Sequence, residues 1–195
     1  NDTEDAVLYV LANEHAYDTT RISVGGSSAG GNMALSLSAR LGSERIKSCF
    51  ALYPAAHLTH PERLDTVMGC VSDKFRSGVV IPHWCMKLFI NAYTTPGTDM
   101  NDPRLSPMFY DASKFPKYVA VACGDADTLY RMSFDLMKKI SGSASGTNVD
   151  GSRRFICVPN EAHEFNTFGR TRASQEERDR VEQEAINMIR ASWRQ

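Results

Sequence analysis

The stretch Ile22-Ser23-Val24-Gly25-Gly26-Ser27-Ser28-Ala29-Gly30-Gly31-Asn32 decides how this chain folds. It predicts a short apolar strand, a Gly-x-Ser-x-Gly turn and the start of a helix. We expect Gly26 and Gly30 to leave room where the strand and the helix cross. Ser28, at the apex, then exposes its hydroxyl above the sheet as a candidate nucleophile. The helix behind it begins with free N–H groups, and the backbone N–H of Ala29 is the candidate donor to a developing oxyanion. The alternative is a plain glycine-rich loop.

Composition limits the class of protein. The 195 residues suit one domain with a sizeable core, and the formal net charge of -1 at pH 7 excludes a strong electrostatic field. We therefore expect neither a nucleic-acid partner nor an anionic membrane surface. No apolar run approaches the ~18 residues that a membrane span requires, so no span is predicted.

The number and spacing of the cysteines indicate the redox state of the cellular compartment. The five of them form an odd set without close pairs or metal-type spacing, at Cys49, Cys70, Cys85, Cys123 and Cys157. Three of these lie in apolar strand patterns, where a free thiol behaves as a small hydrophobe. We predict a reducing compartment and hence a cytoplasmic location, although Cys70 and Cys85 could pair in an exported protein.

Strand and helix patterns alternate along the chain. Largely apolar runs at 22–24, 46–53, 118–123 and 154–158 predict strands, and helical periodicity fills the segments after three of them. A first helix from Asp2 or Thr3 is expected to bury its apolar face. The last helix, near 174–193, has an apolar stripe that could pack on the sheet or contribute to a homodimer. The pattern predicts an α/β fold with a mostly parallel sheet flanked by helices.

The regular alternation is interrupted at about residues 55–107. A polar stretch, a short helix near 61–70 and an apolar segment at 82–92 precede a loop rich in Pro, Gly and Asp. We interpret this segment as a helical lid over the carboxyl edge of the sheet. Candidates for lining a substrate pocket are Ser27, Trp84, Met86, Leu88 and Phe89. The alternative for the four lid residues is that they only pack the lid onto the core.

A nucleophilic serine needs a base, and the base needs an orienting acid. Asp125 and Asp127 follow the strand at 118–123, and either could orient an imidazole or cap the next helix. His163 follows the last strand, after serine and acid in chain order. It is therefore the candidate general base, whereas the other four histidines are interpreted as structural or exposed.

Four stretches together resemble the hormone-sensitive lipase-like esterases, the α/β-hydrolase fold-3 family. They are Asp18 to Asn32 around the serine, Asp102-Pro103-Arg104-Leu105-Ser106-Pro107, Gly124-Asp125-Ala126-Asp127-Thr128-Leu129, and Ala162-His163-Glu164-Phe165. The resemblance implies an α/β-hydrolase fold over residues 1–195 and, because the family's acid stands in a Gly-x-x-Asp-x-Leu context, selects Asp127. His163-Glu164-Phe165 is a variant of the family's His-Gly-Phe. Ser27 stands where most members carry an acidic residue.

The resemblance covers the carboxyl-terminal two thirds of such a domain. The family's opening strands, its His-Gly-Gly-Gly oxyanion segment and the N-terminal part of its lid find no counterpart in the 195 residues. We therefore expect this chain to be a partial catalytic domain that depends on an N-terminal segment of the same protein.

The resemblance implies a serine hydrolase for small or short-acyl carboxylic esters. Ser28, His163 and Asp127 would form its catalytic triad and pass through an acyl-enzyme intermediate, with a small-molecule ester as the partner. No metal or organic cofactor is implied. One alternative is an amidase, such as an arylformamidase, on the same triad. Another is a non-catalytic relative that only binds a ligand.

Overall fold

The computed structural model describes residues 2–194, so residues 1 and 195, at the ends of the expected domain, lie outside the described residues. A parallel sheet of four strands forms the centre of the molecule, in the order β1-β2-β3-β4. The strands are β1 (Ser23–Ser27), β2 (Ser48–Leu52), β3 (Tyr118–Gly124) and β4 (Arg153–Val158). Their register aligns Val24 with Cys49, and Cys49 with Val119. The expected α/β fold with a parallel sheet is confirmed.

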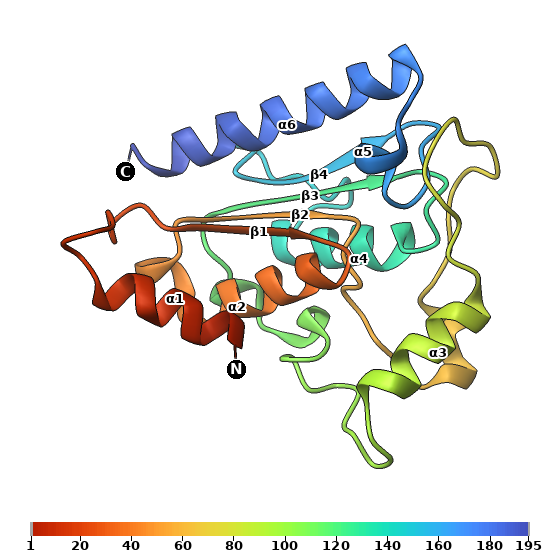
Figure 1. Ribbon diagram of the computed structural model, residues 1–195, viewed down its shortest axis with the longest axis horizontal. Helices are drawn as coiled ribbons and strands as arrows, with labels where there is room; N and C mark the ends of the chain where they lie inside the picture. The colour runs from red at the N-terminus through yellow and green to blue at the C-terminus, as the bar shows by residue number, and fades with distance from the viewer. Residues whose placement is uncertain (1, 195) are drawn as a thin grey trace.

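Helices cover both faces of this sheet (Figure 1). On one face lie α2 (Ala29–Arg45) and α4 (Tyr130–Ser141), and on the other lies α6 (Arg172–Ser192). Successive side chains of β3 point to opposite faces of the sheet and pack in different core clusters. Val119 and Val121 pack in the cluster with α2 and α4, whereas Ala120 and Ala122 pack in the cluster with α6. This two-sided burial explains why β3 is apolar at nearly every position.

Helix α2 is kinked near its end. Gly42 leaves the helical conformation at φ 72° and ψ 175°, and the helix resumes from there to Arg45. A positive φ is accessible to glycine without steric cost, which is why a glycine stands there. The chain then enters β2 with an extended Ile46.

The first helix differs from expectation. Helix α1 (Asp2–Ala12) rests against α2 through an ion pair between Glu4 and Arg40, at 2.9 Å, and none of its described residues is buried. Tyr9 is 63% exposed. The predicted buried face of this helix is therefore wrong for the described residues, whose apolar side chains are half-buried or exposed.

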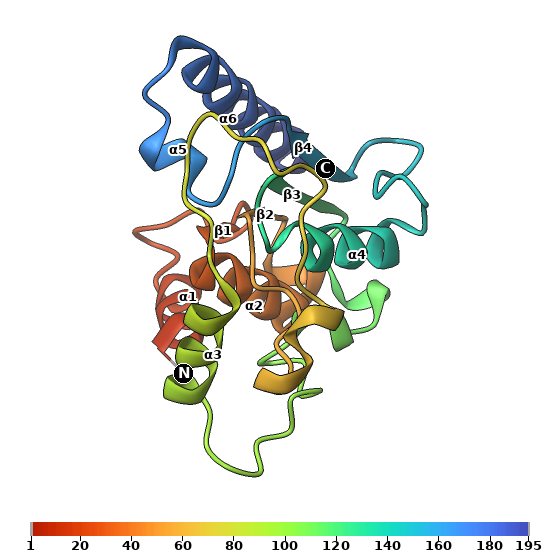
Figure 2. The same cartoon turned by 90° about the vertical axis from the view of Figure 1, so that its right-hand side faces the viewer.

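A long excursion separates β2 from β3. It contains the 3-10 helices η1 (Pro61–Thr66), η2 (Pro107–Phe109) and η3 (Ala112–Lys114), and the helix α3 (His83–Tyr93). In Figure 2, the yellow segment between η1 and α3 passes in front of the strands toward the short helix α5 (Phe165–Phe168). The excursion thus reaches the carboxyl edge of the sheet. Its boundaries as a lid at about 55–107 stay a prediction.

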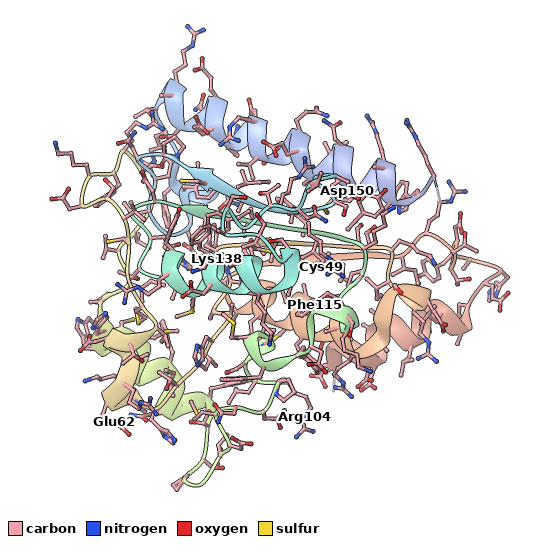
Figure 3. All side chains as sticks on the ribbon, turned by 180° about the vertical axis from the view of Figure 1, so that it is seen from behind. Cys49, Glu62, Arg104, Phe115, Lys138 and Asp150 are labelled. Atoms are coloured by element: carbon pink, nitrogen blue, oxygen red, sulfur yellow. The ribbon has the colours of Figure 1, made fainter. Side chains whose placement is uncertain are left out.

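Most charged side chains lie at the outside of the molecule, and the buried apolar side chains lie between its layers. Figure 3 shows Glu62 and Arg104 at the outer rim of the excursion, whereas Cys49 lies between the sheet and its helices. Cys49 and Phe115 are buried in the same core cluster. All five cysteines are free thiols, with Cys49 and Cys123 buried and Cys70 and Cys157 exposed.

Candidate active site

Ser28 stands at a strained turn between β1 and α2. Its φ is 52° and its ψ is -117°, although it is not a glycine. Such a conformation costs about 1–3 kcal/mol and persists only where the surroundings enforce it. Here the backbone N–H of Ser28 donates to the carbonyl of Leu52 at 2.9 Å, which ties the turn to the end of β2. The side chain is thereby held above the carboxyl edge of the sheet.

The glycines around the serine have unequal roles. A Cβ on Gly26 would lie 2.5 Å from the carbonyl carbon and oxygen of Gly30, so only glycine fits at position 26. A Cβ on Gly31 would lie 3.1 Å from both the Gly26 oxygen and the Pro54 Cβ. A Cβ on Gly30 would meet nothing within 4 Å. The expectation that Gly30 must lack a side chain is therefore wrong, because it is the backbone of Gly30 that approaches Gly26.

His163 contacts both the serine and an acid. Its Nε2 lies 3.0 Å from Ser28 Oγ, and its Nδ1 lies 2.8 Å from Asp127 Oδ2. The imidazole and the carboxylate are almost fully buried, with His163 3% exposed and Asp127 0% exposed. In the tautomer that fits this acid, Nδ1–H donates to the carboxylate and leaves Nε2 free to accept the serine proton. Three side chains from three strand ends therefore form one hydrogen-bonded series.

The two aspartates after β3 have separate contacts. Asp127 Oδ1 accepts a hydrogen bond from the backbone N–H of Leu129 at 2.8 Å, so its carboxylate both faces His163 and holds the turn into α4. Asp125 Oδ1 accepts the backbone N–H of Asn160 at 2.7 Å. Asp125 thus holds the start of the loop that carries His163 and does not contact its imidazole.

Tyr53 supports the imidazole from the side. The two ring centroids are 4.5 Å apart at an interplanar angle of 60°. The phenol of Tyr53 donates to the side-chain oxygen of Asn166, and its backbone has a positive φ of 36° at the end of β2. Burial raises the pKa of Tyr53 to about 12. Tyr53 was not among the candidates from the sequence, although an aromatic residue at a predicted strand end beside Pro54 was a usable signal.

A segment of the excursion holds the backbone of the histidine loop. Val79 and His163 exchange two backbone hydrogen bonds, of 2.7 and 3.0 Å, and Ala162 N–H donates to the carbonyl of Ser77 at 2.9 Å. Gly78 lies between these contacts with a φ of +94°, and a Cβ there would lie 2.4 Å from the His163 oxygen. The histidine loop and the excursion therefore meet backbone to backbone.

Glu161 adds a buried carboxylate to this junction. The residue is 0% exposed, and Arg76 Nε lies 3.1 Å from its Oε1. The hydroxyl of Ser174, at the start of α6, donates to the same oxygen at 2.8 Å, and the hydroxyl of Ser77 donates to Oε2. One carboxylate thus joins the excursion, the histidine loop and α6. Glu161 could not be singled out from the sequence, since a single acid in a loop gives no signal of burial.

A cavity of about 730 Å³ opens in front of Ser28 and His163. Apolar side chains from the excursion form most of its wall. The lining residues include Ala29, Val79, Val80, Ile81, Met86, Phe89, Ile90, Tyr93 and Glu164. The cavity is of the size and character that accepts a small apolar ligand. As the first residue of α2, Ala29 has a backbone N–H without a partner inside the helix.

Two of the expected pocket residues line this cavity and three do not. Met86 and Phe89 line the cavity, Met86 as a buried residue and Phe89 as a half-exposed one. Trp84 and Leu88 are 68% and 58% exposed on the outer side of α3, because helical periodicity turns positions 84 and 88 away from positions 86 and 89. Ser27 is exposed, and its hydroxyl interacts with the phenol of Tyr53. The expectation that Trp84, Leu88 and Ser27 line the pocket is not met.

The described residues offer neither a metal cluster nor a membrane-spanning helix. Within residues 2–194, no group of three or more His, Cys, Asp or Glu side chains is arranged to hold a metal ion. No helix in the same range combines the length and apolar character needed to cross a membrane. The cytoplasmic location inferred from the cysteines stays a prediction.

Comparison with known families agrees with this architecture. A family model described as the alpha/beta hydrolase fold matches residues 1–167. The chain belongs to the α/β-hydrolase family. The family expected from the sequence is thereby confirmed. A search of curated protein sequences gave no match for this hydrolase chain.

Solved structures share the fold of the hydrolase chain at low sequence identity. EstE1, a thermophilic carboxylesterase cloned from a metagenomic library, is 22% identical with a TM-score of 0.72, over 98% of this chain and 62% of its own. Brefeldin A esterase, a bacterial homologue of human hormone-sensitive lipase, is 22% identical with a TM-score of 0.68, over 97% and 54%. Esterase LipW from Mycobacterium marinum is 19% identical with a TM-score of 0.72, over 96% and 57%. The chain thus spans less than two thirds of each of these proteins.

Proposed function

We propose that this chain is the catalytic part of a serine hydrolase for carboxylic esters. Ser28 attacks the ester carbonyl, while His163 Nε2 accepts the serine proton and then gives it to the leaving alkoxide. Asp127 orients the imidazole and stabilises the imidazolium. The acyl group stays on Ser28 until water, activated by His163, releases the acid. The observation that carries this proposal is the contact of His163 with both Ser28 Oγ, at 3.0 Å, and Asp127 Oδ2, at 2.8 Å.

The cavity supports small or short-acyl esters as the substrate class. Its volume of about 730 Å³ and its apolar wall suit a compact ester without a second charged group on the acyl side. Met86 and Phe89 are the candidates for contact with the apolar part of the substrate. The names of the similar structures, among them a carboxylesterase and two esterases, agree with this class.

We propose that a further segment of the same protein completes the catalytic domain. Strand β1 is hydrogen-bonded to β2 on one side and is the edge of the sheet within the described residues. An edge strand of this kind is a template for another strand. The exposed residues of α1 agree with a further covering element. Such a segment would add N–H donors beside that of Ala29, and losing one oxyanion donor typically costs ~10²–10³ in turnover.

The test of the hydrolase begins with the serine. Ser28→Ala is expected to abolish both the cleavage of p-nitrophenyl butyrate and labelling by a fluorophosphonate probe. Retained turnover in the variant would rule out the mechanism. A protein that binds ligand without catalysis would leave the probe unreacted even with Ser28 in place. Comparing a matched ester and anilide separates an esterase from an amidase, since the triad chemistry is common to both.

The dependence on a further segment has its own test. Turnover of the 195-residue chain is compared with turnover of the longest form that the source produces, after intact mass has established each length. We expect the longer form to be faster by roughly 10²-fold or more. Equal turnover would exclude this dependence.

A homodimer stays a prediction, because the apolar side of α6 already packs on β2 and β3. Size-exclusion chromatography with light scattering measures that state directly.

A further inference from the structure

Glu164, the residue after the candidate base, has a backbone conformation that favours glycine. Its φ is 57° and its ψ is 30°, in the left-handed region. A residue other than glycine is uncommon in this region and needs an explanation. Helix capping does not supply one. Glu164 is the N-cap of α5, but its side chain makes no capping hydrogen bond.

Glu164 lines the cavity that opens onto Ser28. Of the described residues that line this cavity, Glu164 is the only one with a carboxylate, and none is a lysine or an arginine. The residue is partly buried. Within residues 2–194, its carboxylate has no ion pair and no hydrogen bond to another side chain; only its backbone oxygen accepts bonds, from Thr167 and Phe168. A negative charge without a partner among the described residues therefore faces a largely apolar space.

The position of this charge relative to the reacting atoms identifies which part of an ester it meets. His163 Nε2 stands 3.0 Å from Ser28 Oγ and hands its proton to the oxygen of the leaving alcohol. The leaving alcohol must therefore lie on the histidine side of the cavity. Glu164 follows His163 directly and lines the same cavity, so the alcohol part of a bound ester is the part on the side of Glu164.

The surroundings of Glu164 favour a cation there. Phe89 and Tyr93 line the same cavity, and aromatic faces attract ammonium groups. The charge of Glu164 also acts on the phenol of Tyr53. Burial raises the pKa of Tyr53 to about 12, and the negative charge of Glu164 contributes to this rise. A carboxylate in a cavity that also has aromatic rings, and to which the described residues contribute no positive side chain, attracts a positively charged group and repels an anionic one.

We propose that Glu164 makes the enzyme prefer esters whose alcohol part carries a positive charge, such as an alkylammonium group. The preference rests on the proposed ester hydrolysis at Ser28. An ester with an anionic alcohol part is disfavoured for the same reason, since its charge would lie beside an unpartnered carboxylate.

Two esters of the same shape and different charge test this proposal. Butyrylcholine carries a quaternary ammonium where 3,3-dimethylbutyl butyrate carries a neutral tert-butyl group. The ratio of their kcat/KM values is measured for the full-length protein and for Glu164→Gln. We expect the substitution to lower the cationic-to-neutral ratio roughly tenfold, the size of one partly desolvated charge interaction. Added salt should lower the ratio of the unmodified protein and leave that of the variant nearly constant.

Control variants make the outcome decisive. Glu62→Gln removes a charge from η1, outside the cavity, and should leave the ratio unchanged. Glu164→Gly removes the same carboxylate and relieves the backbone strain, so it carries the test if Glu164→Gln does not fold. A ratio that both Glu164 variants leave intact, or an equal fall for both esters, overturns the proposal.

The same experiment separates this proposal from the proposed function. If Ser28→Ala leaves hydrolysis of the neutral ester intact, or if the neutral ester is not hydrolysed at all, the ester hydrolase itself is wrong and the preference falls with it. If the neutral ester is hydrolysed through Ser28 and the charge ratio does not depend on Glu164, only the preference is wrong.

Discussion

The backbones of Val79 and His163 are paired. The N–H of Val79 donates to the His163 carbonyl at 2.7 Å, and the N–H of His163 donates to the Val79 carbonyl at 3.0 Å. Val79 lines the cavity, and His163 contacts Ser28. A shift in the cavity wall at Val79 would therefore move the backbone that carries the imidazole, so the excursion belongs to the geometry of the candidate site as well as to the pocket.

Gly78 tests this coupling. Gly78→Ala would place a Cβ 2.4 Å from the His163 oxygen, so we expect the histidine loop to shift and kcat to fall by roughly 10²-fold, as for a misplacement of about 1 Å. Gly97→Ala is the matched control. Gly97 has a similar φ of +85° and open space around it, so alanine there brings the backbone strain without the contact. Steady-state kinetics on a p-nitrophenyl ester compare the two. Equal losses would show that strain alone is responsible.

The turn that carries Ser28 gives a second prediction. Gly26→Ala forces a Cβ to within 2.5 Å of the Gly30 backbone, and overpacking of this kind costs typically 1–3 kcal/mol. We expect a lower free energy of unfolding in urea and the loss of fluorophosphonate labelling. Gly30→Ala should fold normally and gain up to ~1 kcal/mol, since alanine favours a helix. An inactive Gly30→Ala protein of normal stability would contradict the distinction between the two glycines.

Glu161 gives a third prediction, as a positioning residue that acts through the histidine loop. Glu161→Gln keeps the shape of the side chain but leaves Arg76 without its 3.1 Å ionic partner. We expect the free energy of unfolding to fall by about 1–3 kcal/mol, and kcat to fall more than KM rises. Glu184→Gln removes a partner of Arg180 on α6, at 2.9 Å, and serves as the control for an ion pair far from His163.

The kinetic split distinguishes positioning from simple stability. If Glu161→Gln lowers stability but leaves kcat unchanged at a temperature where the protein is folded, the carboxylate only holds the fold together. Arg76→Gln should produce a similar loss of kcat, and the double variant should lose less than the sum of the two single variants, because both changes remove the same interaction.

Tyr53 gives a prediction about alkaline pH. Burial raises the pKa of Tyr53 to about 12 from its ordinary 10.0, so the folded protein keeps a proton that the unfolded chain releases first. The stability that this provides is present below about pH 10 and is lost as the pH rises toward 12. Since one pKa unit corresponds to about 1.4 kcal/mol, the loss from a partly solvated phenol is on the order of 1–2 kcal/mol.

Tyr53→Phe removes this titration. Urea unfolding at about pH 9 and about pH 11 should show a smaller fall in the free energy of unfolding for the variant than for the unmodified protein. Other buried groups also titrate in this range; burial raises the pKa of Cys49, for example, to about 12. Their contribution is the same in both proteins and cancels in the comparison. A fall of the same size in both would assign the alkaline loss to groups other than Tyr53.

Much of the fold was predictable because its signals are local. Apolar runs too short for helices and the helical periodicity between them indicated a parallel sheet, and the strand–turn–helix around Ser28 indicated where a nucleophile would stand. The face of α1 was not predictable in this way. Its periodicity is that of an amphipathic helix, yet burial of a face depends on which elements lie next to it.

The candidate site divides along the same line. The turn chemistry at Ser28 and the position of His163 after the last strand were visible in the sequence, as was the presence of an acid after β3. Which of the carboxylates contacts the imidazole depended on the resemblance, because Asp125 and Asp127 occupy equivalent places in the chain. In the structure, Asp125 binds the backbone of Asn160 and Asp127 faces His163.

Only the tertiary structure decided which residues surround the histidine. Tyr53, Val79 and Glu161 come from separate segments, and no spacing in the chain predicts that they meet at one loop. The sequence by itself determined the strands, the strained serine turn and the order of the three polar residues, since these follow from steric limits and periodicity between near neighbours. Contacts across the excursion depend instead on how one long segment folds back over the sheet. The free energy of that arrangement is a sum over distant contacts, and a local pattern does not contain it.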